Sequence, residues 1–333
     1  MRVAQSNSAI RLEGRGCAVG IDVGGTKIAA GIVNFPSGEV TARQVVPTRP
    51  ERGGEAVLAD VMDLARGLAA QCRTASVDFA GVGVAVAELV DAAGNVTSEQ
   101  TVAWTKIPVQ ERLSAIAPAL VESDVRAAAL AEACFGAGKS YSLVCYVTVG
   151  TGISYTLVQD GRPYTGARGN ALILASAPLT IECPHCQKEV SRILEEYASG
   201  PALVSRYNQK TRQKAVKCED VIEAAESQEP SAVEVVRSAG RALGSSVGFL
   251  INVLDPTVLV VGGGLGLAGG LYWQSFVEST RRHVWSDATR NLPILPAALG
   301  VDAGIVGAAT AVSNRRGKLG NATGVVTAAT HRE

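Results

Sequence analysis

The sequence predicts an α/β protein of two domains, and three observations support this class. Short apolar runs, of the length of strands, alternate along the chain with longer segments whose apolar residues recur at helical spacing. A strand–glycine turn–strand unit near the start is echoed in the middle of the chain, which indicates two copies of one supersecondary unit. The 333 residues are 47% hydrophobic and 19% charged, which is enough to bury two cores of ordinary size.

Charge and composition exclude several classes of protein. Lys and Arg total 31, and Asp and Glu also total 31, so net charge gives no reason to expect a nucleic-acid partner or an anionic membrane. No run reaches the roughly 18 apolar residues that a membrane span needs. The seven cysteines are an odd number and stand mostly alone in apolar stretches, which is typical of buried, reduced thiols in a cytoplasmic protein.

Periodicity and turn residues give the order of the elements. Before residue 124 we expect three strands, a helix, a strand, a short helix and a strand, in the segments 17–46, 55–72, 79–86, 108–120 and 119–122. After it we expect helices near 125–135, 194–207, 218–225, 230–250, 271–284 and 302–313, and strands at 143–149, 153–159, 258–261 and 293–299. Residues 1–16 and 315–333 are expected to be flexible tails.

The chain is organised around the stretch from Val19 to Val33, where two apolar runs flank a glycine turn. The turn consists of Gly24, Gly25, Thr26 and Lys27. Two glycines give a strong hairpin signal and let a phosphate approach the backbone amides, and the next two side chains add donors. Asp22, at the end of the first run, is suited to hold Mg²⁺ through water. A tight hairpin with a capping aspartate explains the same residues, so the motif alone leaves both interpretations open.

A second glycine turn lies between the strands expected at 143–149 and 153–159. It consists of Gly150, Thr151 and Gly152. Because it repeats the first unit, we expect the two turns to hold different phosphates of one nucleotide across a cleft. A third glycine cluster follows the buried strand at 258–261 and consists of Gly262, Gly263 and Gly264.

In their order and spacing these motifs resemble the ROK family of sugar kinases, within the actin-like, hexokinase-like ATPase superfamily. The resemblance runs from about Val19 to Ser313 and rests on GIDVGGTKIAAGIV, SDVRAAALAEACFGAGK, VTVGTGISYTLV, LEEYASGPAL, DPTVLVVGGG and LGVDAGIVGAA. It implies a two-domain α/β fold, actin-like or hexokinase-like (ribonuclease H-like), around a central cleft. The implied domains are residues 17–122 with 303–314, and residues 123–302.

The resemblance also implies roles at matched positions. Asp22 and the first turn correspond to the family's first phosphate motif, the second turn to its second, and Gly262–Gly264 to its adenosine motif, so ATP and Mg²⁺ are implied. Asp124 falls on the family's catalytic base. The chemistry agrees, because a sugar hydroxyl has a pKa far above 7 and needs a positioned carboxylate to accept its proton as it attacks the γ-phosphoryl group. A helix N-cap role explains Asp124 as well.

The sequence departs from the family where the sugar is bound. Ser123 stands where members carry Asn before the catalytic Asp. The motif that begins at Gly166 holds Asn170 as expected, but residues 172–176 then read Leu-Ile-Leu-Ala-Ser in place of the sugar-clamping Glu and the zinc-binding His. Glu195 matches a sugar-contacting Glu of the family, although an exposed helix carboxylate explains it too. Ser123, Asn170 and Glu195 are therefore the candidate substrate contacts.

The family's cysteine motif is also broken. Cys183 and Cys186 keep the spacing of a zinc pair, but a structural zinc site needs four ligands. His185 and the distant Cys218 are the remaining candidates, so the sequence leaves the metal unknown.

The lost clamp bears on the acceptor. Ile173 and Ser176 would leave an apolar wall and one short hydroxyl where the family binds ring hydroxyls, which should weaken discrimination for glucose. The altered pattern is similar to that of C7-cyclitol kinases, relatives within the family. We therefore expect ATP-dependent phosphorylation of a primary hydroxyl on a valiolone-type cyclitol or a hexose, by a protein that the resemblance suggests is a homodimer.

Three other functions fit parts of the sequence. Residues 264–269 form G-x-G-x-x-G after a strand, which is a dinucleotide fingerprint, but too few strand–helix units follow for that fold. A sugar-dependent repressor of the same family would carry a DNA-binding domain ahead of the fold, and about 16 residues precede the first strand here. A catalytically impaired sugar-binding protein stays open because the clamp is degraded.

Overall fold

The computed structural model describes residues 16–74, 77–182, 186, 189–212 and 214–326. Contacts within the chain divide it into two compact units. Unit 1 holds the described residues up to Ser142, together with Val158–Ala171 and those from Val301 onward, and unit 2 holds Leu143–Leu157 and Leu172–Gly300. Two five-stranded sheets with helices between their strands confirm the predicted α/β class.

Unit 1 is built on a sheet with the strand order β3-β2-β1-β4-β5. Its strands are β1 (Gly16–Val23), β2 (Lys27–Phe35), β3 (Glu39–Pro47), β4 (Asp78–Val86) and β5 (Ala119–Ser123). β1 and β2 form the predicted antiparallel hairpin, in which Asp22 pairs with Ala29, while β4 runs parallel to both β1 and β5. β1, β2 and β4 are apolar and buried along most of their length, as central strands with both faces covered require.

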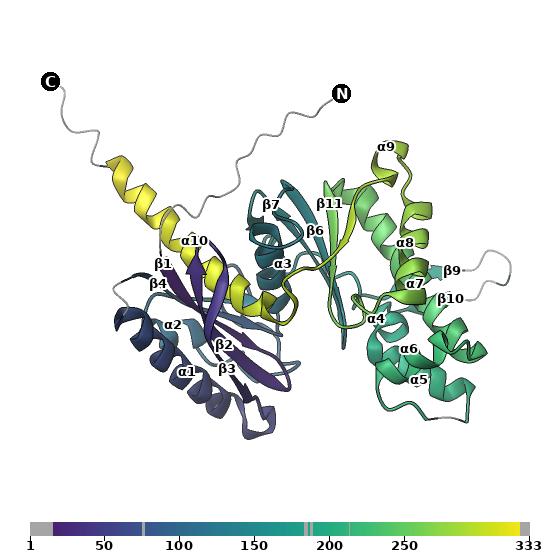
Figure 1. Cartoon of the computed structure of the whole chain (residues 1–333), viewed down its shortest axis with the longest axis horizontal. Coiled ribbons are helices and arrows are strands. Elements are labelled where there is room, and N and C mark those ends of the chain that lie inside the picture. Colours follow the sequence, from purple (N-terminus) through teal and green to yellow (C-terminus); the bar gives the residue numbers. More distant parts are fainter. Residues whose placement is uncertain (1–15, 75–76, 183–185, 187–188, 213, 327–333) are drawn as a thin grey trace. The chain divides into compact units, whose positions relative to one another are not determined.

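Helices cover both faces of this sheet. α1 (Gly54–Thr74) and α2 (Val109–Ser114) lie on one face, and α10 (Ala303–Val326) lies on the other (Figure 1). Short 3₁₀ turns precede α1 and α10, at Pro50–Arg52 and Gly300–Asp302. α3 (Asp124–Cys134) follows β5 directly and packs along α10. This packing groups α3 with unit 1, on the other side of the domain boundary expected at residue 123.

Glycines let α10 approach the sheet closely. A Cβ atom on Gly20 of β1 would lie 2.0 Å from the Ile305 carbonyl oxygen, and one on Gly83 of β4 would lie 1.8 Å from that of Ala308. On the helix itself, a Cβ on Gly307 would lie 1.8 Å from the Ala127 carbonyl oxygen of α3. Since these neighbours are backbone atoms, no side-chain movement would relieve such contacts.

The helix predicted at 302–313 is longer than expected. α10 continues to Val326, so residues 315–326, expected to form part of a tail, are helical. Arg316 ties this extension to the sheet, because its guanidinium donates to the Phe79 carbonyl oxygen at 2.6 Å and pairs with Asp78 at 2.9 Å. Gly16, also placed in a tail, begins β1. Residues 1–15 and 327–333 lie outside the described residues.

The second sheet has the order β12-β11-β6-β7-β8. Its strands are β6 (Leu143–Val149), β7 (Ile153–Gln159), β8 (Arg162–Pro163), β11 (Val258–Gly262) and β12 (Ile294–Pro296). β11 runs parallel to both β6 and β12. Outside the strands expected from the sequence, β9 (Leu179–Glu182) and β10 (Glu189–Arg192) form an antiparallel pair.

The helices of unit 2 are α4 (Glu195–Ala198), α5 (Gly200–Lys210), α6 (Cys218–Glu226), α7 (Pro230–Leu254), α8 (Gly270–His283) and α9 (Asp287–Arg290). The single helix predicted at 194–207 is broken at Ser199, whose hydroxyl caps α5 by accepting from Ala202 N. α7 and α8 pack side by side (Figure 1). Three glycines one turn apart on α7 allow this close approach, since a Cβ on any of them would lie 2.4–2.9 Å from a carbonyl oxygen of α8. These glycines are Gly240, Gly244 and Gly248.

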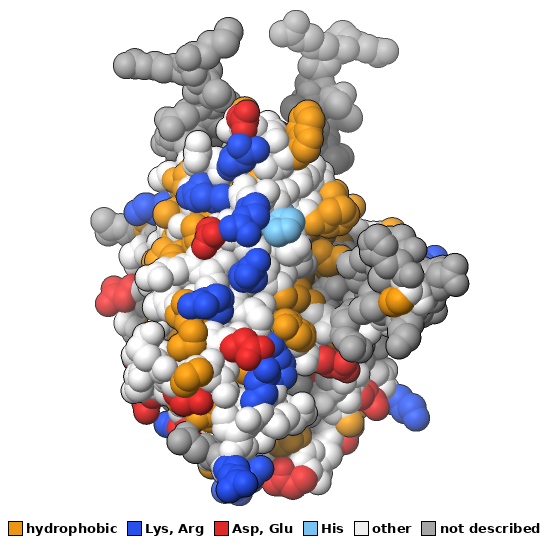
Figure 2. All heavy atoms as spheres, turned by 90° about the vertical axis from the view of Figure 1, so that its right-hand side faces the viewer, with side chains coloured by type: hydrophobic (Ala, Val, Ile, Leu, Met, Phe, Trp, Pro, Cys, Tyr) orange, Lys and Arg blue, Asp and Glu red, His pale blue; other side chains and the backbone are white. Residues whose placement is uncertain are grey.

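The exposed helices of unit 2 carry mixed charge. Figure 2 shows Lys and Arg side chains along this side of the molecule, with acidic and hydrophobic side chains among them. Several cations are paired, such as Lys210 with Glu234 at 2.8 Å and Arg282 with Glu278 at 2.5 Å. Within the part of the chain that the structure describes, no helix has the length and apolarity that crossing a membrane requires.

The close approach of α10 predicts opposite effects for two glycine substitutions. Gly83→Ala should lower the free energy of unfolding by about 2–3 kcal/mol, because the new methyl group overlaps backbone atoms of α10. Gly67→Ala is the matched control on α1, where nothing lies within 4 Å of the added Cβ, and it should raise stability by about 0.5–1 kcal/mol. Urea unfolding measures both. An unchanged midpoint for Gly83→Ala would contradict the packing described.

Candidate active site

The first glycine turn joins β1 to β2. Gly24 N donates to the Lys27 carbonyl oxygen at 3.1 Å. Thr48 braces the turn, since its backbone N donates to the Thr26 carbonyl oxygen at 3.1 Å and its hydroxyl donates to that of Gly24 at 2.6 Å. None of these bonds uses the Asp22 carboxylate. The hairpin is therefore closed without Asp22 as a cap, which was one of the two interpretations that the sequence left open. The tip of the turn is exposed to solvent.

Asp22 lies half-buried at the end of β1, beside the first turn of α10. A Cβ on Gly304 would lie 2.4 Å from Asp22 Oδ2, so only glycine lets the helix come this close to the carboxylate. Burial raises the pKa of Asp22 to about 6, against the lowering influence of Lys27. The positive end of the helix dipole favours the ionised form. Asp22 therefore remains mostly a carboxylate at neutral pH.

Asp124 is the first residue of α3, and Ser123 rather than Asp124 is the N-cap residue. Asp124 Oδ1 accepts a hydrogen bond from Val125 N at 2.7 Å. Solvent reaches the carboxylate, yet desolvation by the surrounding protein raises its pKa to about 7, and repulsion from Asp22 and Glu88 acts in the same direction. A pKa near the working pH suits a general base.

Ser123 carries a buried hydroxyl next to Asp124. Although Ser123 stands at the N-cap, its side chain accepts no capping hydrogen bond, and Oγ has no hydrogen-bond partner among the described residues. A buried polar atom without a partner costs stability. Ser123 Oγ is therefore an unsatisfied polar atom next to Asp124 in the sequence.

Asn170 is exposed in the loop that follows β8. Arg126, the third residue of α3, holds this loop: its guanidinium donates to the carbonyl oxygens of Gly169 and Val90, each at 2.7 Å, and pairs with Glu122. Gly169 has a φ of +79°, and a Cβ there would lie 2.2 Å from the Val90 carbonyl oxygen. Sequence analysis missed Arg126, whose only signal is a cation in an Ala-rich helix.

Glu88 is a second residue that sequence analysis missed. Its side chain is 5% exposed, just beyond β4. It accepts hydrogen bonds from the Ser98 hydroxyl and from the backbone N–H groups of Gln100, Thr101 and Val102. The sequence did carry a signal, because an acid directly after an apolar strand is the pattern that singled out Asp22.

The second glycine turn lies in unit 2. Gly150 N donates to the Gly152 carbonyl oxygen at 2.9 Å, and the Gly150 carbonyl oxygen accepts from Gly200 N at 2.8 Å, at the start of α5. Thr151 is exposed at the tip. The start of α5 thus holds the base of the turn, while the tip is exposed to solvent.

The third glycine cluster lies against this turn. The Val149 carbonyl oxygen accepts from the backbone N–H groups of Leu265 and Gly266, each at 3.0 Å. Gly263 has a φ of +81°, and a Cβ there would lie 2.3 Å from the same oxygen. Gly264 has nothing within 4 Å of its Cβ position, so the loop is packed on one side and open on the other.

Glu195 begins α4 and is half-buried. Its Oε2 accepts from Ile153 N at 2.7 Å, and a Cβ on Gly152 would lie 2.7 Å from that oxygen. Oε1 has no hydrogen-bond partner in the described structure. Glu195 thus differs from a carboxylate that merely projects from a helix, because one oxygen closes the second glycine turn and the other is free.

The predicted site residues fall into two groups, one in each unit. Unit 1 holds Asp22, Gly24, Gly25, Thr26, Lys27, Ser123, Asp124 and Asn170, and unit 2 holds Gly150, Thr151, Gly152, Glu195, Gly262, Gly263 and Gly264. Ile173, which is 41% exposed, and Ser176 also belong to unit 2.

The predicted cysteine pair is only partly described. Cys183 and His185 lie outside the described residues, whereas Cys186 is an exposed free cysteine. Cys218 is half-buried, and desolvation raises the pKa of its thiol to about 11. Among the residues with described positions, no three His, Cys, Asp or Glu side chains converge as metal ligands.

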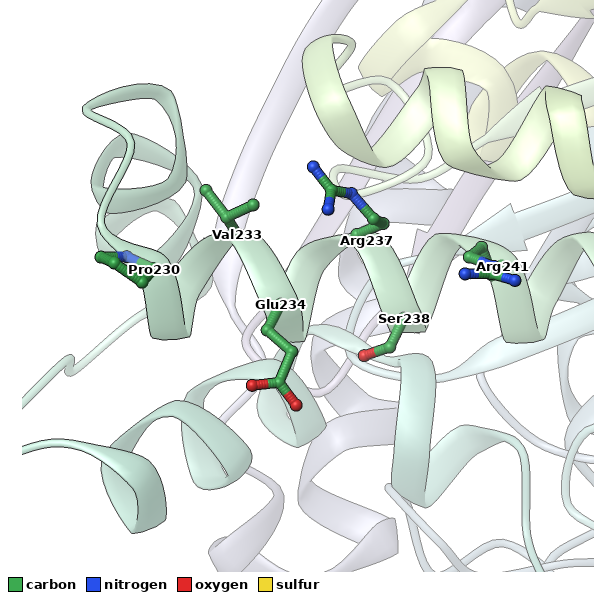
Figure 3. Close-up of a pocket in the computed structure, with 6 residues that line it drawn as sticks. All are labelled: Pro230, Val233, Glu234, Arg237, Ser238 and Arg241. Atoms are coloured by element: carbon green, nitrogen blue, oxygen red, sulfur yellow. The ribbon is translucent and has the colours of Figure 1, made fainter.

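A cavity of about 310 Å³ lies along α7, and none of the predicted site residues lines it. Its lining consists of Pro230, Val233, Glu234, Arg237, Ser238 and Arg241. Figure 3 shows Glu234 and Ser238 on the opposite side of α7 from Arg237, so their polar groups do not converge. Ser238 Oγ already accepts from Arg206 at 2.6 Å, and Glu234 is paired with Lys210. This cavity is not a candidate active site.

Residues 18–315 match the ROK family. The chain belongs to the ROK family. Among its ROK relatives, a glucokinase from Streptomyces coelicolor is 30% identical over 315 residues, which cover 88% of this chain and 96% of the relative. The structure of a ROK hexokinase from Thermus thermophilus matches with a TM-score of 0.77 and 31% identity, over 91% of this chain and 99% of that one.

A ROK family glucokinase from Streptomyces griseus, solved with glucose and AMPPNP, matches with a TM-score of 0.73 and 28% identity, over 89% of this chain and 99% of that one. These matches confirm the predicted family and its actin-like, hexokinase-like α/β fold. They also set aside the dinucleotide-binding interpretation of residues 264–269, because this segment lies within the match to the ROK family.

The raised pKa of Asp124 predicts a stability penalty at high pH. The folded state binds this proton more tightly than the unfolded chain does, so the stabilisation is full below pH 4 and is lost as the pH rises through 7. Asp124→Asn should therefore unfold with a free energy about 1 kcal/mol higher than the parent at pH 8, after allowance for solvent screening of an exposed carboxylate. The two proteins should converge towards pH 4 in urea unfolding.

Asp220 supplies a control of opposite sign for this measurement. Hydrogen bonds from the Lys217 and Val216 backbone N–H groups lower its pKa. Asp220→Asn should therefore lose stability at neutral pH, and its deficit should shrink as the pH falls. If Asp124→Asn instead proves less stable than the parent at pH 8, the assignment of a raised pKa to Asp124 is wrong.

Proposed function

We propose that this ROK protein is an ATP-dependent phosphotransferase that phosphorylates a primary hydroxyl of a sugar-like acceptor. One observation supports this more than any other: solvent reaches the Asp124 carboxylate, whose pKa is raised to about 7, and the buried Ser123 hydroxyl beside it has no partner. The similarity to a glucokinase and a hexokinase over most of the chain also supports a carbohydrate kinase.

Asp124 acts as the general base in this proposal. Because Oδ1 already accepts from Val125 N, Oδ2 takes the proton of the acceptor hydroxyl. The hydroxyl oxygen bonds to the γ-phosphorus as the bond between that phosphorus and the bridging β–γ oxygen breaks, and ADP leaves with the electron pair. A carboxylate whose pKa lies near 7 accepts this proton more readily than one with the ordinary value near 4.

The glycine-rich segments would hold ATP. The first turn in unit 1, and the second turn with Gly262–Gly264 in unit 2, offer open backbone next to exposed side chains. Asp22 would hold Mg²⁺ through water, which fits an ion that keeps several waters and needs only one or two carboxylates. When bound, Mg²⁺ neutralises charge on the phosphates. The free donors at Thr26, Lys27 and Thr151 would contact phosphate oxygens.

Three polar groups would contact the acceptor. These are the Ser123 hydroxyl, the exposed Asn170 side chain and Glu195 Oε1. The exposed Ile173 offers an apolar surface in the segment where the sequence lacks the family's sugar clamp. We propose a valiolone-type C7-cyclitol as the preferred acceptor and a hexose as the next candidate. An apolar surface forms no hydrogen bonds with the hydroxyls that distinguish glucose.

The same loss of the clamp favours one second candidate, a sugar-binding protein with impaired catalysis. It would bind sugars without turning over ATP. Homodimer formation and a cytoplasmic location also remain predictions, the first from the family resemblance and the second from cysteine usage.

The experiment that tests the proposal is an acceptor panel. Valiolone-type cyclitols and hexoses are supplied separately with Mg²⁺ and ATP, and ADP release and phosphorylated product are measured. We expect cyclitols to give the higher kcat/KM. A clear preference for glucose would reject the cyclitol assignment, and ligand binding without any ADP release would support the impaired binding protein instead.

Replacing the base gives a separate prediction. Asp124→Asn should bind nucleotide and acceptor as the parent does, while kcat falls on the order of 10²–10⁴-fold, because the acceptor hydroxyl loses its proton acceptor. In the parent, kcat/KM for the acceptor should fall below about pH 7 as Asp124 becomes protonated. A variant with near-normal turnover would remove Asp124 from the mechanism.

A further inference from the structure

The Glu88 carboxylate uses its full capacity as an acceptor. Oε1 accepts from Thr101 N and from Val102 N, the latter at 2.9 Å, and Oε2 accepts from the Ser98 hydroxyl and from Gln100 N, the latter at 2.9 Å. Ser98 Oγ in turn accepts from Leu89 N at 2.8 Å. The segment 98–102 is therefore tied to the end of β4 through one buried side chain.

This segment lies against the first glycine turn. A Cβ on Gly25 would lie 3.1 Å from Thr101 Cγ2, so the threonine methyl group packs over the glycine. The far end of the segment is also anchored, because the buried Trp104 donates from its indole N–H to the Gly54 carbonyl oxygen at 2.8 Å, at the start of α1. Thr101 is thus held against Gly25 by Glu88 and by the hydrogen bond of Trp104, which follows it in the chain.

A neutral side chain of the same shape could not replace Glu88. Four donors converge on it, and only an ionised carboxylate offers two acceptor oxygens. In Glu88→Gln the amide NH₂ would face two of these donors, whichever way it turned.

We propose that Glu88 is a positioning residue of the phosphotransfer site: it holds Thr101 against Gly25 and so keeps the first glycine turn in the shape that receives nucleotide phosphates. The inference rests on the proposed function. Because all its acceptor sites are occupied, Glu88 does not touch the nucleotide itself. Its effect reaches the ligand through the segment 98–102.

The test measures binding of Mg²⁺ with AMPPNP by calorimetry, in the full chain. Glu88→Gln should weaken this binding roughly tenfold and lower kcat/KM for ATP on the order of 10²-fold, as expected for a displaced binding element. Hydrogen exchange at the amides of residues 100–102 should become faster. Glu55→Gln is the matched control, since Glu55 is an exposed acid of α1 paired with Arg112, and it should bind as the parent does.

Thr101→Ser provides a second test of the same binding if Glu88→Gln does not fold. It retains every hydrogen bond to Glu88 and removes only the methyl group over Gly25, so the dissociation constant should rise about threefold with little change in stability. Parent-like AMPPNP binding in Thr101→Ser, or in a folded Glu88→Gln, would overturn the inference alone. A parent chain that does not bind Mg²⁺ with AMPPNP would overturn the proposed function and this inference with it.

Discussion

The close packing of α10 on the sheet of unit 1 is the constraint on which the rest of that unit depends. Backbone carbonyl groups of the helix occupy the space that side chains on Gly20 and Gly83 would fill. This approach has two consequences for the site. Gly304 comes against the Asp22 carboxylate, and Gly307 leaves room for α3, whose first residue is Asp124. One helix therefore sets the positions of two acids from distant parts of the sequence.

Acidic groups then gather where burial penalises them. Asp22 and Asp124 both have raised pKa values, and Glu88 adds a third negative charge. The three differ in their hydrogen bonds, since Glu88 accepts four, Asp124 accepts one from its neighbour, and the turn beside Asp22 is closed without it. A fold that concentrates unsatisfied carboxylates loses stability, and such sites are where catalytic and metal-binding groups are commonly found. Glu88 shows the contrasting case, in which a buried charge organises a loop.

The local parts of the site could be predicted because their signals are local. Two glycines between apolar runs specify a hairpin whatever surrounds it, and both predicted turns formed, next to the expected strands. Arg126 escaped prediction because two of its partners are distant in sequence, and Glu88 because only its place after an apolar strand marked it. Arg126 reaches Gly169, 43 residues away, and Glu88 holds a loop that carries no motif of its own. The length of α10 was also underestimated, because its polar end is held by Arg316 contacting β4 rather than by an apolar stripe.

By itself the sequence determined the α/β class, the order of the longer strands and helices, the glycine turns and the family, because periodicity and turn chemistry act over a few residues. Only the tertiary structure decided which unit α3 joins, that Ser123 rather than Asp124 occupies its N-cap position, and that Glu195 closes the second turn with one oxygen. It also decided which acids lie together. Those outcomes depend on desolvation and packing between segments far apart in the chain, and no pattern within a single segment encodes them.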